Sequence, residues 1–243
     1  MKEKVIDAFN QLSGRYEHEV DATNLYNTEY ERPSMVELLP ETLQGWHVLD
    51  AGCAAGWYTE HLLNKGAVAA AIDISPNMVE AAKRRTKGKA KIVLADLTEP
   101  LPFEDDAFDL IISSLTMHYV KDWDRTFSEF ARILKSGGIF QFSVHHPMSD
   151  IELSPEKAYF ETERIADYWN NGTEKVEVQF YRRPLHQIVN VTTTYFELKC
   201  MKEPIPTEQF KKRNPSSYEK LLRRPNFLII QALNSKKRKG DGS

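Results

Sequence analysis

Five short apolar runs in the first 145 residues constrain the fold of this chain more than any other feature. Helical patterns of about ten to fifteen residues separate most of them. Continuously apolar strands that alternate with helices indicate βαβ units and a parallel sheet that is covered on both faces. The runs are residues 46–49, 67–72, 91–95, 108–113 and 139–144, and two further strands are expected at 195–201 and 226–232. We therefore expect an α/β protein with a doubly wound, seven-stranded, mostly parallel sheet.

Cap and turn residues set the expected limits of the helices. Ser75 followed by Pro76 is typical of a helix N-cap and first turn. The same reasoning predicts that Gly14 interrupts an N-terminal helix and that Gly137 and Gly138 separate a helix from the fifth strand. A proline-marked loop is expected before the last strand.

Composition excludes several classes of protein. The formal net charge of −3, from 32 basic and 35 acidic residues, gives no overall attraction to nucleic acid. No apolar stretch approaches the roughly 20 residues of a membrane span, and no signal peptide follows the charged N-terminus. Cys53 and Cys200 are too few for a disulfide framework, which fits a cytoplasmic protein. The basic run at 236–239 is interpreted as a solvated tail, with a nucleic-acid or targeting role as the alternative.

A polar residue stands at the carboxyl end of each of the five predicted strands. In open parallel sheets, ligands bind beyond the carboxyl ends of the strands, where the strand order switches. The residues concerned are Asp50, Asp73, Asp96, Ser113 and His145. We expect them to lie along one rim and to mark a ligand site.

The turn after the first strand narrows the class of ligand. A nicotinamide dinucleotide site would have the spacing G-x-G-x-x-G, whereas Cys-Ala-Ala separates Gly52 from Gly56. A carboxylate at Asp50 would repel a pyrophosphate but would stabilise a ligand that carries a cation. Asp73 stands where nucleoside-binding folds place an acid for ribose hydroxyls, and Asp96 could accept a hydrogen bond from an exocyclic amine. These residues favour a cationic nucleoside ligand.

Four segments, taken in order, carry a family resemblance. They are V-L-D-A-G-C-A-A-G at 48–56, A-I-D-I-S-P-N-M at 71–78, A-D-L-T-E-P-L-P-F-E-D-D-A-F-D at 95–109 and R-I-L-K-S-G-G at 132–138. At family spacing, they closely resemble the successive motifs of class I S-adenosylmethionine-dependent methyltransferases, over roughly residues 45–145. Residues 24–40 and the His-His-Pro at 145–147 look like a bacterial small-molecule branch of that family, similar to the type 11 methyltransferases. The resemblance implies a Rossmann-like methyltransferase fold and S-adenosyl-L-methionine as the cofactor.

The resemblance also assigns cofactor contacts residue by residue. Asp50 and the turn from Gly52 to Gly56 would hold the methionine part of the cofactor, Asp73 the ribose hydroxyls and Met78 the adenine face. The complete expected cofactor set is Tyr16, Asp50, Gly52, Cys53, Gly56, Asp73, Ile74, Met78, Asp96, Leu97, Ser113 and Leu115.

The resemblance assigns four of these residues to the adenine edge and to the sulfonium side of the cofactor. One further position differs from the family pattern. Asp96 and Leu97 would contact the adenine edge, whereas Ser113 and Leu115 would line the sulfonium and substrate side. Position 54 is commonly glycine in the family and is Ala54 here. The turn must therefore hold an alanine in an allowed conformation or carry strain.

The catalytic candidates follow from the chemistry of methyl transfer. Transfer from a sulfonium is an in-line displacement that depends mainly on positioning, and it needs a base only if the acceptor starts protonated. His118 and His145 are the candidate bases, with His118 the first choice, although each could instead support a neighbour by hydrogen bonding. No histidine spacing supports a metal site. The candidate substrate contacts are Tyr26, Tyr30, His146, Tyr168, Trp169 and Arg182.

The absence of two signatures favours a small-molecule acceptor. The Asp/Asn-Pro-Pro-aromatic signature of amino-methylating DNA enzymes is replaced by Ser-Ser-Leu-Thr at 113–116, and neither cysteine follows a proline as in cytosine C5 methylation. We expect methylation of an O or N atom of a small molecule. A non-catalytic protein that binds the cofactor or a nucleoside is the alternative, and an NAD-dependent oxidoreductase comes third. The sequence leaves open whether the protein is a monomer or a homodimer.

The chain is expected to form one domain with an insertion after the fifth strand. Aromatic residues and the alternating Val176, Val178 and Phe180 suggest a strand or hairpin over the sheet. The expected parts are an N-terminal helical cap (1–40), a cofactor-binding core (41–145), a substrate lid or insertion (146–184), C-terminal sheet strands (185–234) and a flexible tail (235–243).

Overall fold

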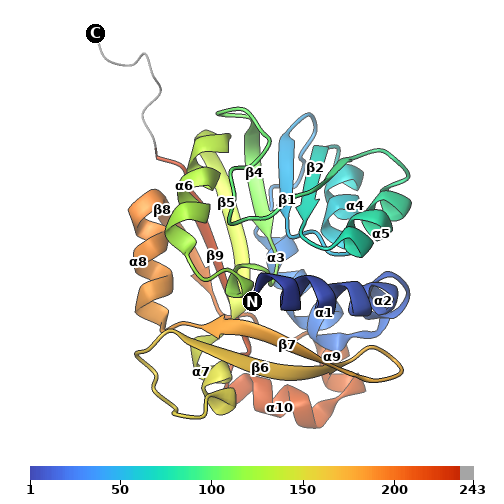
Figure 1. Ribbon diagram of the computed structural model, residues 1–243, viewed down its shortest axis with the longest axis vertical. Helices are drawn as coiled ribbons and strands as arrows, with labels where there is room; N and C mark the ends of the chain where they lie inside the picture. Colours follow the sequence, from blue (N-terminus) through green and yellow to red (C-terminus); the bar gives the residue numbers. More distant parts are fainter. Residues whose placement is uncertain (236–243) are drawn as a thin grey trace.

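The computed structural model describes residues 1–235, which are built around a seven-stranded sheet (Figure 1). Its strands are β1 (His47–Ala51), β2 (Val68–Asp73), β3 (Lys91–Leu94), β4 (Phe108–Ser113), β5 (Leu134–His145), β8 (Glu197–Lys202) and β9 (Phe227–Leu233). The order is β3-β2-β1-β4-β5-β9-β8, in which β1 to β5 pair in parallel and β9 runs antiparallel to both of its neighbours. This confirms the doubly wound, mostly parallel sheet that the apolar runs predicted.

Helices cover both faces of this sheet. They are α1 (Lys2–Arg15), α2 (Asp21–Thr23), α3 (Arg32–Glu37), α4 (Trp57–Asn64), α5 (Pro76–Thr86), α6 (Trp123–Ile133), α7 (Pro147–Asp150), α8 (Leu185–Tyr195), α9 (Glu208–Arg213) and α10 (Pro215–Arg223). Short turns of other helix types are η1 (Tyr16–Val20), η2 (Asn27–Glu31), η3 (Met117–Tyr119) and η4 (Ile151–Leu153).

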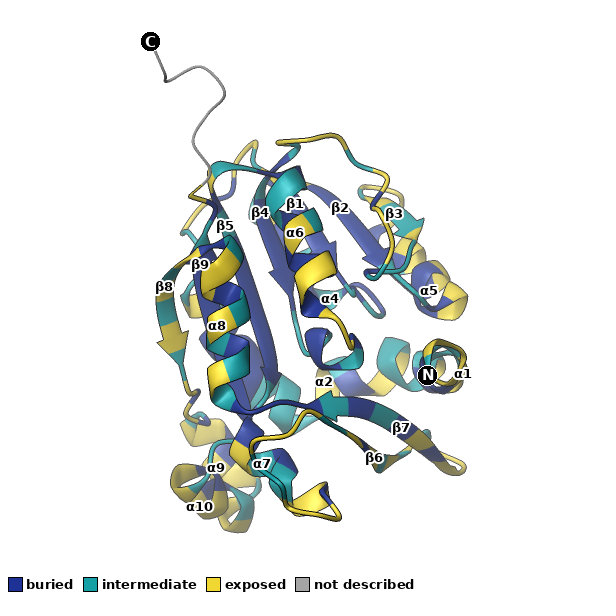
Figure 2. Ribbon diagram, turned by 60° about the vertical axis from the view of Figure 1, so that its left-hand side comes forward, coloured by how far each residue is buried: buried dark blue, intermediate teal, exposed yellow. Residues whose placement is uncertain are grey.

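Alternating apolar side chains along each strand build a core on each face. Leu49 and Ile111 pack with Phe127 of α6 on one face, while Val48 and Ile112 pack with helices α3 and α4 on the other. Successive strand residues point to opposite faces, so a strand that is buried on both sides must be apolar throughout. Figure 2 shows these central strands as the continuous buried part of the molecule.

Local sequence signals place several helix ends as predicted. The Ser75 side chain accepts a hydrogen bond from the Met78 backbone N–H, and Pro76 is the first residue of α5. Gly56 begins α4 with φ of 82°, a left-handed conformation that suits glycine.

The glycine and loop predictions were wrong at three places. Gly14 lies inside α1, where it is tolerated, and the helix continues into η1. Gly137 and Gly138 lie within β5, and the pairing of β5 with β4 shifts register between Phe108 and Leu110 to accommodate them. The expected loop before the last strand contains α9 and α10.

A separate two-stranded hairpin lies beyond the carboxyl ends of the sheet strands. It consists of β6 (Glu163–Asn170) and β7 (Lys175–Arg182), and the alternation that predicted a strand falls on β7. Val178 and Phe180 of β7 pack with Leu12 of α1, so α1 lies between the hairpin and the sheet (Figure 1).

Residues 1–235 contain neither a membrane-spanning helix nor a metal-binding cluster. Within this range, no helix has both the length and the apolar character needed to cross a membrane. The same residues contain no group of three or more His, Cys, Asp or Glu side chains that could hold a metal ion. The predicted basic tail at 236–239 lies outside the described residues.

Candidate functional site

A cavity of about 840 Å³ opens at the carboxyl ends of the strands. Its walls are the ends of β1 to β5, one face of α1, η2 with its flanking residues, and the β6–β7 hairpin. A volume of this size lies in the range of small-ligand sites. The rim predicted from strand-end residues is therefore the floor of a cavity.

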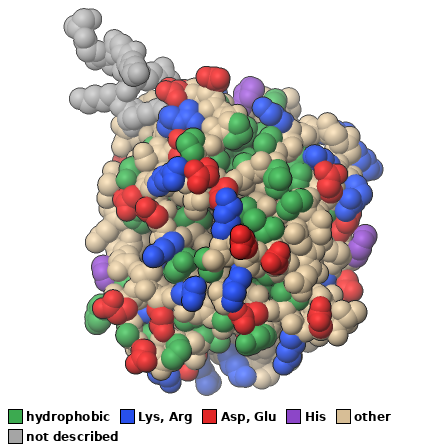
Figure 3. All heavy atoms as spheres, in the orientation of Figure 1, with side chains coloured by type: hydrophobic (Ala, Val, Ile, Leu, Met, Phe, Trp, Pro, Cys, Tyr) green, Lys and Arg blue, Asp and Glu red, His purple; other side chains and the backbone are tan. Residues whose placement is uncertain are grey.

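On the outer face shown in Figure 3, acidic and basic side chains are interspersed.

The turn after β1 approaches the cavity with its backbone. Gly52 has φ of 84°, and a Cβ atom there would lie 2.3 Å from Cγ2 of Thr116. Ala54 has φ of 45°, which confirms that this alanine occupies the left-handed region. Its backbone N–H donates a 2.9 Å hydrogen bond to Oδ2 of Asp73. That bond accounts for the strained alanine, because it aims the amide at the carboxylate.

A buried carboxylate, Asp50, and a partly buried one, Asp73, lie beside this turn. Asp73 accepts a second backbone hydrogen bond, from the Ser75 N–H at 2.8 Å. Asp50 accepts a side-chain hydrogen bond from the Thr59 hydroxyl at 2.6 Å. Burial raises the pKa of Asp73 to about 6 and the pKa of Asp50 to about 7, despite these bonds. A cation in the cavity would lower both values by favouring the ionised forms.

Asp96 has a different environment at the end of β3. Its Oδ1 accepts hydrogen bonds from the backbone and side chain of Thr98, and its Oδ2 pairs with Nζ of Lys2 at 2.6 Å. Burial alone would raise the pKa of Asp96, but the bonds from Lys2 and Thr98 outweigh it and lower the pKa. The first turn of α1 is thus tied to the sheet rim.

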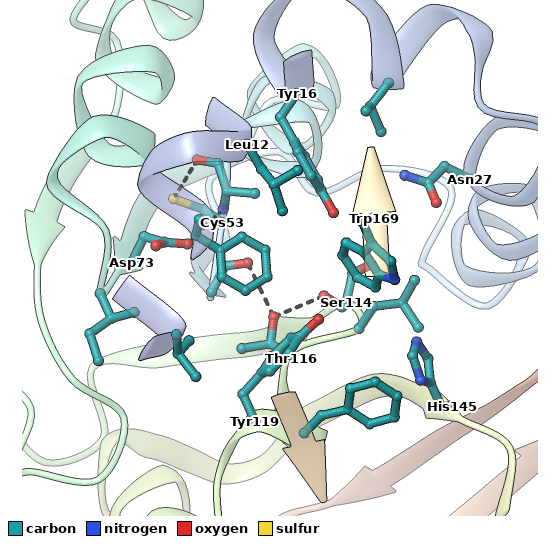
Figure 4. A pocket seen from close by; sticks show the side chains of 18 of the residues that line it. Leu12, Tyr16, Asn27, Cys53, Asp73, Ser114, Thr116, Tyr119, His145 and Trp169 are labelled. Atoms are coloured by element: carbon teal, nitrogen blue, oxygen red, sulfur yellow. Dashed lines mark hydrogen bonds between the residues drawn. The ribbon is translucent and has the colours of Figure 1, made fainter. Parts of the chain in front are cut away.

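The far end of the cavity contains a histidine at the end of β5. The His145 ring points into the cavity (Figure 4), and its Nδ1 lies 3.4 Å from a carboxylate oxygen of Asp150. His118 stacks on His145 with ring centroids 4.1 Å apart. His118 is buried, neither ring nitrogen has a hydrogen-bond partner among the described residues, and burial lowers its pKa well below the usual value.

The placement of His118 corrects the first choice made from the sequence. Its ring does not line the cavity and instead packs beneath His145. The neutral form that burial favours makes it an apolar support rather than a substrate-facing base.

The structure brings twelve of the predicted site residues to the cavity and leaves eight outside it. Those that line it are Tyr16, Tyr26, Asp50, Gly52, Cys53, Asp73, Ile74, Asp96, Leu97, Leu115, His145 and Trp169. Those that do not are Gly56, Met78, Ser113, Tyr30, His118, His146, Tyr168 and Arg182. Figure 4 shows Tyr16, Trp169 and His145 around the same space.

The four predicted substrate residues outside the cavity have other partners. Arg182 is buried and donates hydrogen bonds to the carbonyls of Ala158, Tyr159 and Glu161, so its charge is used inside the protein. The Tyr30 hydroxyl accepts a hydrogen bond from the Asn226 N–H, and His146 contacts Glu203 and caps α7. Tyr168 is exposed on the outer side of β6.

The three predicted cofactor residues outside the cavity are structural in this arrangement. The Ser113 hydroxyl donates to the Ala51 carbonyl and ties β4 to β1. A Cβ at Gly56 would lie 3.0 Å from Cβ of Ala82, so glycine there lets α4 approach α5. Met78 is fully buried under the N-terminal helix.

Several cavity residues were missed from the sequence. Glu31 carries a buried carboxylate, and Arg32 pairs with Asp21 and lies over the Trp57 ring at 4.1 Å. Further examples are Asn27, Tyr58, Ser114, Thr116, Tyr119 and Asp150. The sequence showed only an acid two residues before Pro33, and it offered no partner for Glu31.

Comparisons with known proteins agree with this geometry. The family described as "Methyltransferase domain" matches residues 49–142. An uncharacterized protein of Haemophilus influenzae is 27% identical over 229 residues, which cover 85% of this chain and 87% of the other. The malonyl-[acyl-carrier protein] O-methyltransferase of Buchnera aphidicola is 30% identical over 143 residues, which cover 59% of this chain but only 55% of that enzyme.

A solved structure extends the similarity to the whole fold. A Listeria monocytogenes protein assigned to the S-adenosylmethionine-dependent methyltransferases superposes with a TM-score of 0.74 at 26% identity. The superposition covers 85% of this chain and 97% of the Listeria chain.

Proposed function

Because this chain belongs to the class I S-adenosylmethionine-dependent methyltransferases, we propose that it methylates an O or N atom of a small-molecule acceptor bound in the cavity described above. One observation carries the proposal: a single cavity joins the acids at the carboxyl ends of β1, β2 and β3 to His145 and the aromatic residues of the hairpin. A cofactor and a second molecule could therefore meet inside it.

The residues present fit the cofactor. Gly52 lines the cavity with its backbone alone, because a Cβ there would collide with Thr116, and the buried Asp50 has no basic partner among its hydrogen bonds in residues 1–235. The turn and Asp50 would bind the methionine part, Asp73 the ribose hydroxyls, and Asp96 with Leu97 the adenine edge. When bound, the cofactor supplies an electrophilic methyl group on a sulfonium.

The remaining cavity residues would position the acceptor and exclude water. Trp169 and Tyr26 offer aromatic faces, which suit a cation, and Tyr16 lies on the α1 side of the same space. His145, paired with Asp150, would take a proton from an acceptor that presents a hydroxyl group. We propose that residues 146–184, which include the hairpin, act as the substrate lid.

Calorimetry with S-adenosylmethionine and S-adenosylhomocysteine, followed by transfer of a radiolabelled methyl group to a panel of amines, alcohols and carboxylates, tests the proposal. We expect binding of both nucleosides and transfer to at least one class of acceptor. Binding without transfer to any acceptor would support the non-catalytic alternative, and tight binding of NADH instead of both nucleosides would support the oxidoreductase.

A further inference from the structure

Glu31 is a buried carboxylate whose hydrogen-bond donors are all hydroxyl groups. Oε2 accepts from the Tyr58 hydroxyl at 2.7 Å, and Oε1 accepts from the hydroxyls of Ser143 at 2.6 Å and Ser114 at 2.8 Å. The residue is 1% exposed and lines the cavity. Three neutral donors orient the carboxylate without neutralising its charge, and they leave one of its roughly four lone-pair positions open.

Arg32, the next residue in sequence, does not form an ion pair with the Glu31 carboxylate. Its guanidinium pairs with Asp21 and lies over the Trp57 ring. Burial raises the pKa of Glu31, whereas the bonds from Ser143, Tyr58 and Ser114 act in the opposite direction, and Arg32 has the weakest influence. A buried charge without a cationic partner costs free energy until a cation binds beside it.

Glu31 belongs to the half of the cavity that the cofactor acids do not occupy. Two of its three partners, Ser114 and Ser143, lie at the ends of β4 and β5, and the third, Tyr58, lies in α4. The acids proposed for the cofactor lie at or just beyond the ends of β1, β2 and β3. Asp150 faces the same half through its contact with His145. The acceptor end therefore contains two buried acids.

The basic side chains that line the cavity are engaged or exposed. Lys2 pairs with Asp96, Arg32 with Asp21, and Arg15 donates to the Asn170 carbonyl. Lys121, the other basic side chain of the lining, is exposed. Within residues 1–235, a carboxylate acceptor would thus meet buried acids and no buried, uncommitted cation. The apolar walls of this half come from Tyr26, Trp169, Phe180 and Phe227.

We propose that the methyl acceptor is an amine that carries an aromatic or other apolar group, and that Glu31 binds its ammonium and takes up one proton from it. This inference rests on the proposed function. The neutral nitrogen then forms a bond to the methyl carbon with its lone pair, while the carbon–sulfur pair moves onto sulfur. The products are S-adenosylhomocysteine and an N-methylated ammonium, and the proton on Glu31 is released to solvent when they leave.

Binding to the complex with S-adenosylhomocysteine tests this assignment without requiring the natural acceptor. The enzyme is first titrated with S-adenosylhomocysteine and then with matched probes: benzylamine, 2-phenylethylamine and 4-phenylbutylamine, the corresponding alcohols, and the corresponding carboxylates. We expect at least one amine to bind at least tenfold more tightly than its alcohol and its carboxylate. Glu31→Gln should lose at least tenfold in amine affinity and keep its affinity for S-adenosylhomocysteine.

A matched control and a second readout separate the possible outcomes. Glu37→Gln, on the same N-terminal segment but paired at the surface with Lys202, should leave amine binding unchanged. The comparison of amine with carboxylate uses the wild-type protein, so it holds even if Glu31→Gln fails to fold. Equal or tighter binding of alcohols or carboxylates, or no binding of any amine, overturns the inference while leaving the proposed function intact. Loss of S-adenosylhomocysteine binding in the wild type would instead overturn the proposed function.

Discussion

The two ends of the cavity hold their acids in different ways. At the end proposed for the cofactor, Asp73 and Asp96 accept hydrogen bonds from backbone N–H groups close to them in sequence, at Ser75 and Thr98. At the end proposed for the acceptor, Glu31 is held by side chains, and its partner Ser143 is 112 residues away. Asp73 and Asp96 thus each have at least one partner two residues away, whereas the partners of Glu31 are 27, 83 and 112 residues away. A family can therefore keep one end while the other changes its ligand.

The largest expected effect tests the backbone of the cofactor end. We expect Gly52→Ala to weaken S-adenosylmethionine binding about a hundredfold, or about 2.7 kcal/mol, because φ of 84° strains alanine and its Cβ collides with Thr116. Calorimetry measures the change. Gly14→Ala is the control, since a Cβ added there in α1 would meet no atom of another segment within 4 Å. Wild-type affinity in Gly52→Ala would show that the turn does not contact the cofactor.

The second effect tests the backbone-held carboxylate. Asp73→Asn should weaken cofactor binding about twentyfold, or about 2 kcal/mol, because an amide cannot accept hydrogen bonds from both Ala54 and Ser75 on two oxygens. Asp109→Asn is a matched control, because Asp109 also accepts a backbone N–H, from His47, but does not line the cavity. If both variants lose stability yet bind the cofactor equally, the assigned role of Asp73 is wrong.

The third effect is a pH dependence at the cofactor end. Burial raises the pKa of Asp50 to about 7 and that of Asp73 to about 6, from ordinary values near 4, so the folded protein keeps protons that the unfolded chain has released. The free energy of unfolding of the ligand-free protein should therefore fall as pH rises from about 4 to 7. Affinity for the cationic cofactor should rise about five- to tenfold from pH 6 to pH 8 as Asp50 ionises.

Calorimetry and denaturant unfolding across this range check both directions. Asp50→Asn should remove most of the rise in affinity. A cofactor affinity that falls with pH in the wild-type protein would contradict the assigned charge of Asp50.

The smallest expected effect tests whether the β6–β7 hairpin contacts the cofactor. Trp169→Ala should change S-adenosylhomocysteine affinity by less than about twofold, because this ring lines the cavity from the hairpin rather than from the sheet rim. Tyr168→Ala is its control, since that neighbouring side chain is 60% exposed. A tenfold loss in Trp169→Ala alone would place the hairpin in the cofactor site.

The sequence predicted the parts of the molecule that depend on local chemistry. Apolar runs gave the seven-stranded sheet, and Ser75 with Pro76 placed the start of α5, because both signals act within a few residues. The prediction that Gly137 and Gly138 end a helix before β5 was wrong, because an irregularity in the pairing of β4 with β5 accommodates both glycines within the strand. The loop expected before the last strand contained α9 and α10, whose caps, Thr207 and Asn214, lie among residues that also favour turns.

In the candidate site, too, the sequence predicted the residues whose place depends on local position and missed those that depend on tertiary contacts. Asp50, Asp73 and Asp96 could be placed because each ends a strand, and the structure brings all three to the cavity. Arg182 was misjudged because no local signal shows that three carbonyls surround its guanidinium. Glu31 was missed because its three hydroxyl partners come from α4, the end of β4 and β5. Contacts of this kind exist only once the chain has folded.

Helix α1 has a kinetic consequence for turnover. Met1, Lys2 and the inner face of α1 line the cavity. Lys2 pairs with Asp96 at the start of the helix, and Glu17 of η1, just beyond its end, pairs with Arg84. Both ion pairs involve side chains that reach solvent, so dissolved salt weakens them. We expect the residence time of the spent nucleoside to shorten as ionic strength rises, which stopped-flow displacement would record as a faster off-rate. In dilute buffer, the opening of this helix would then limit how often the protein can complete a cycle.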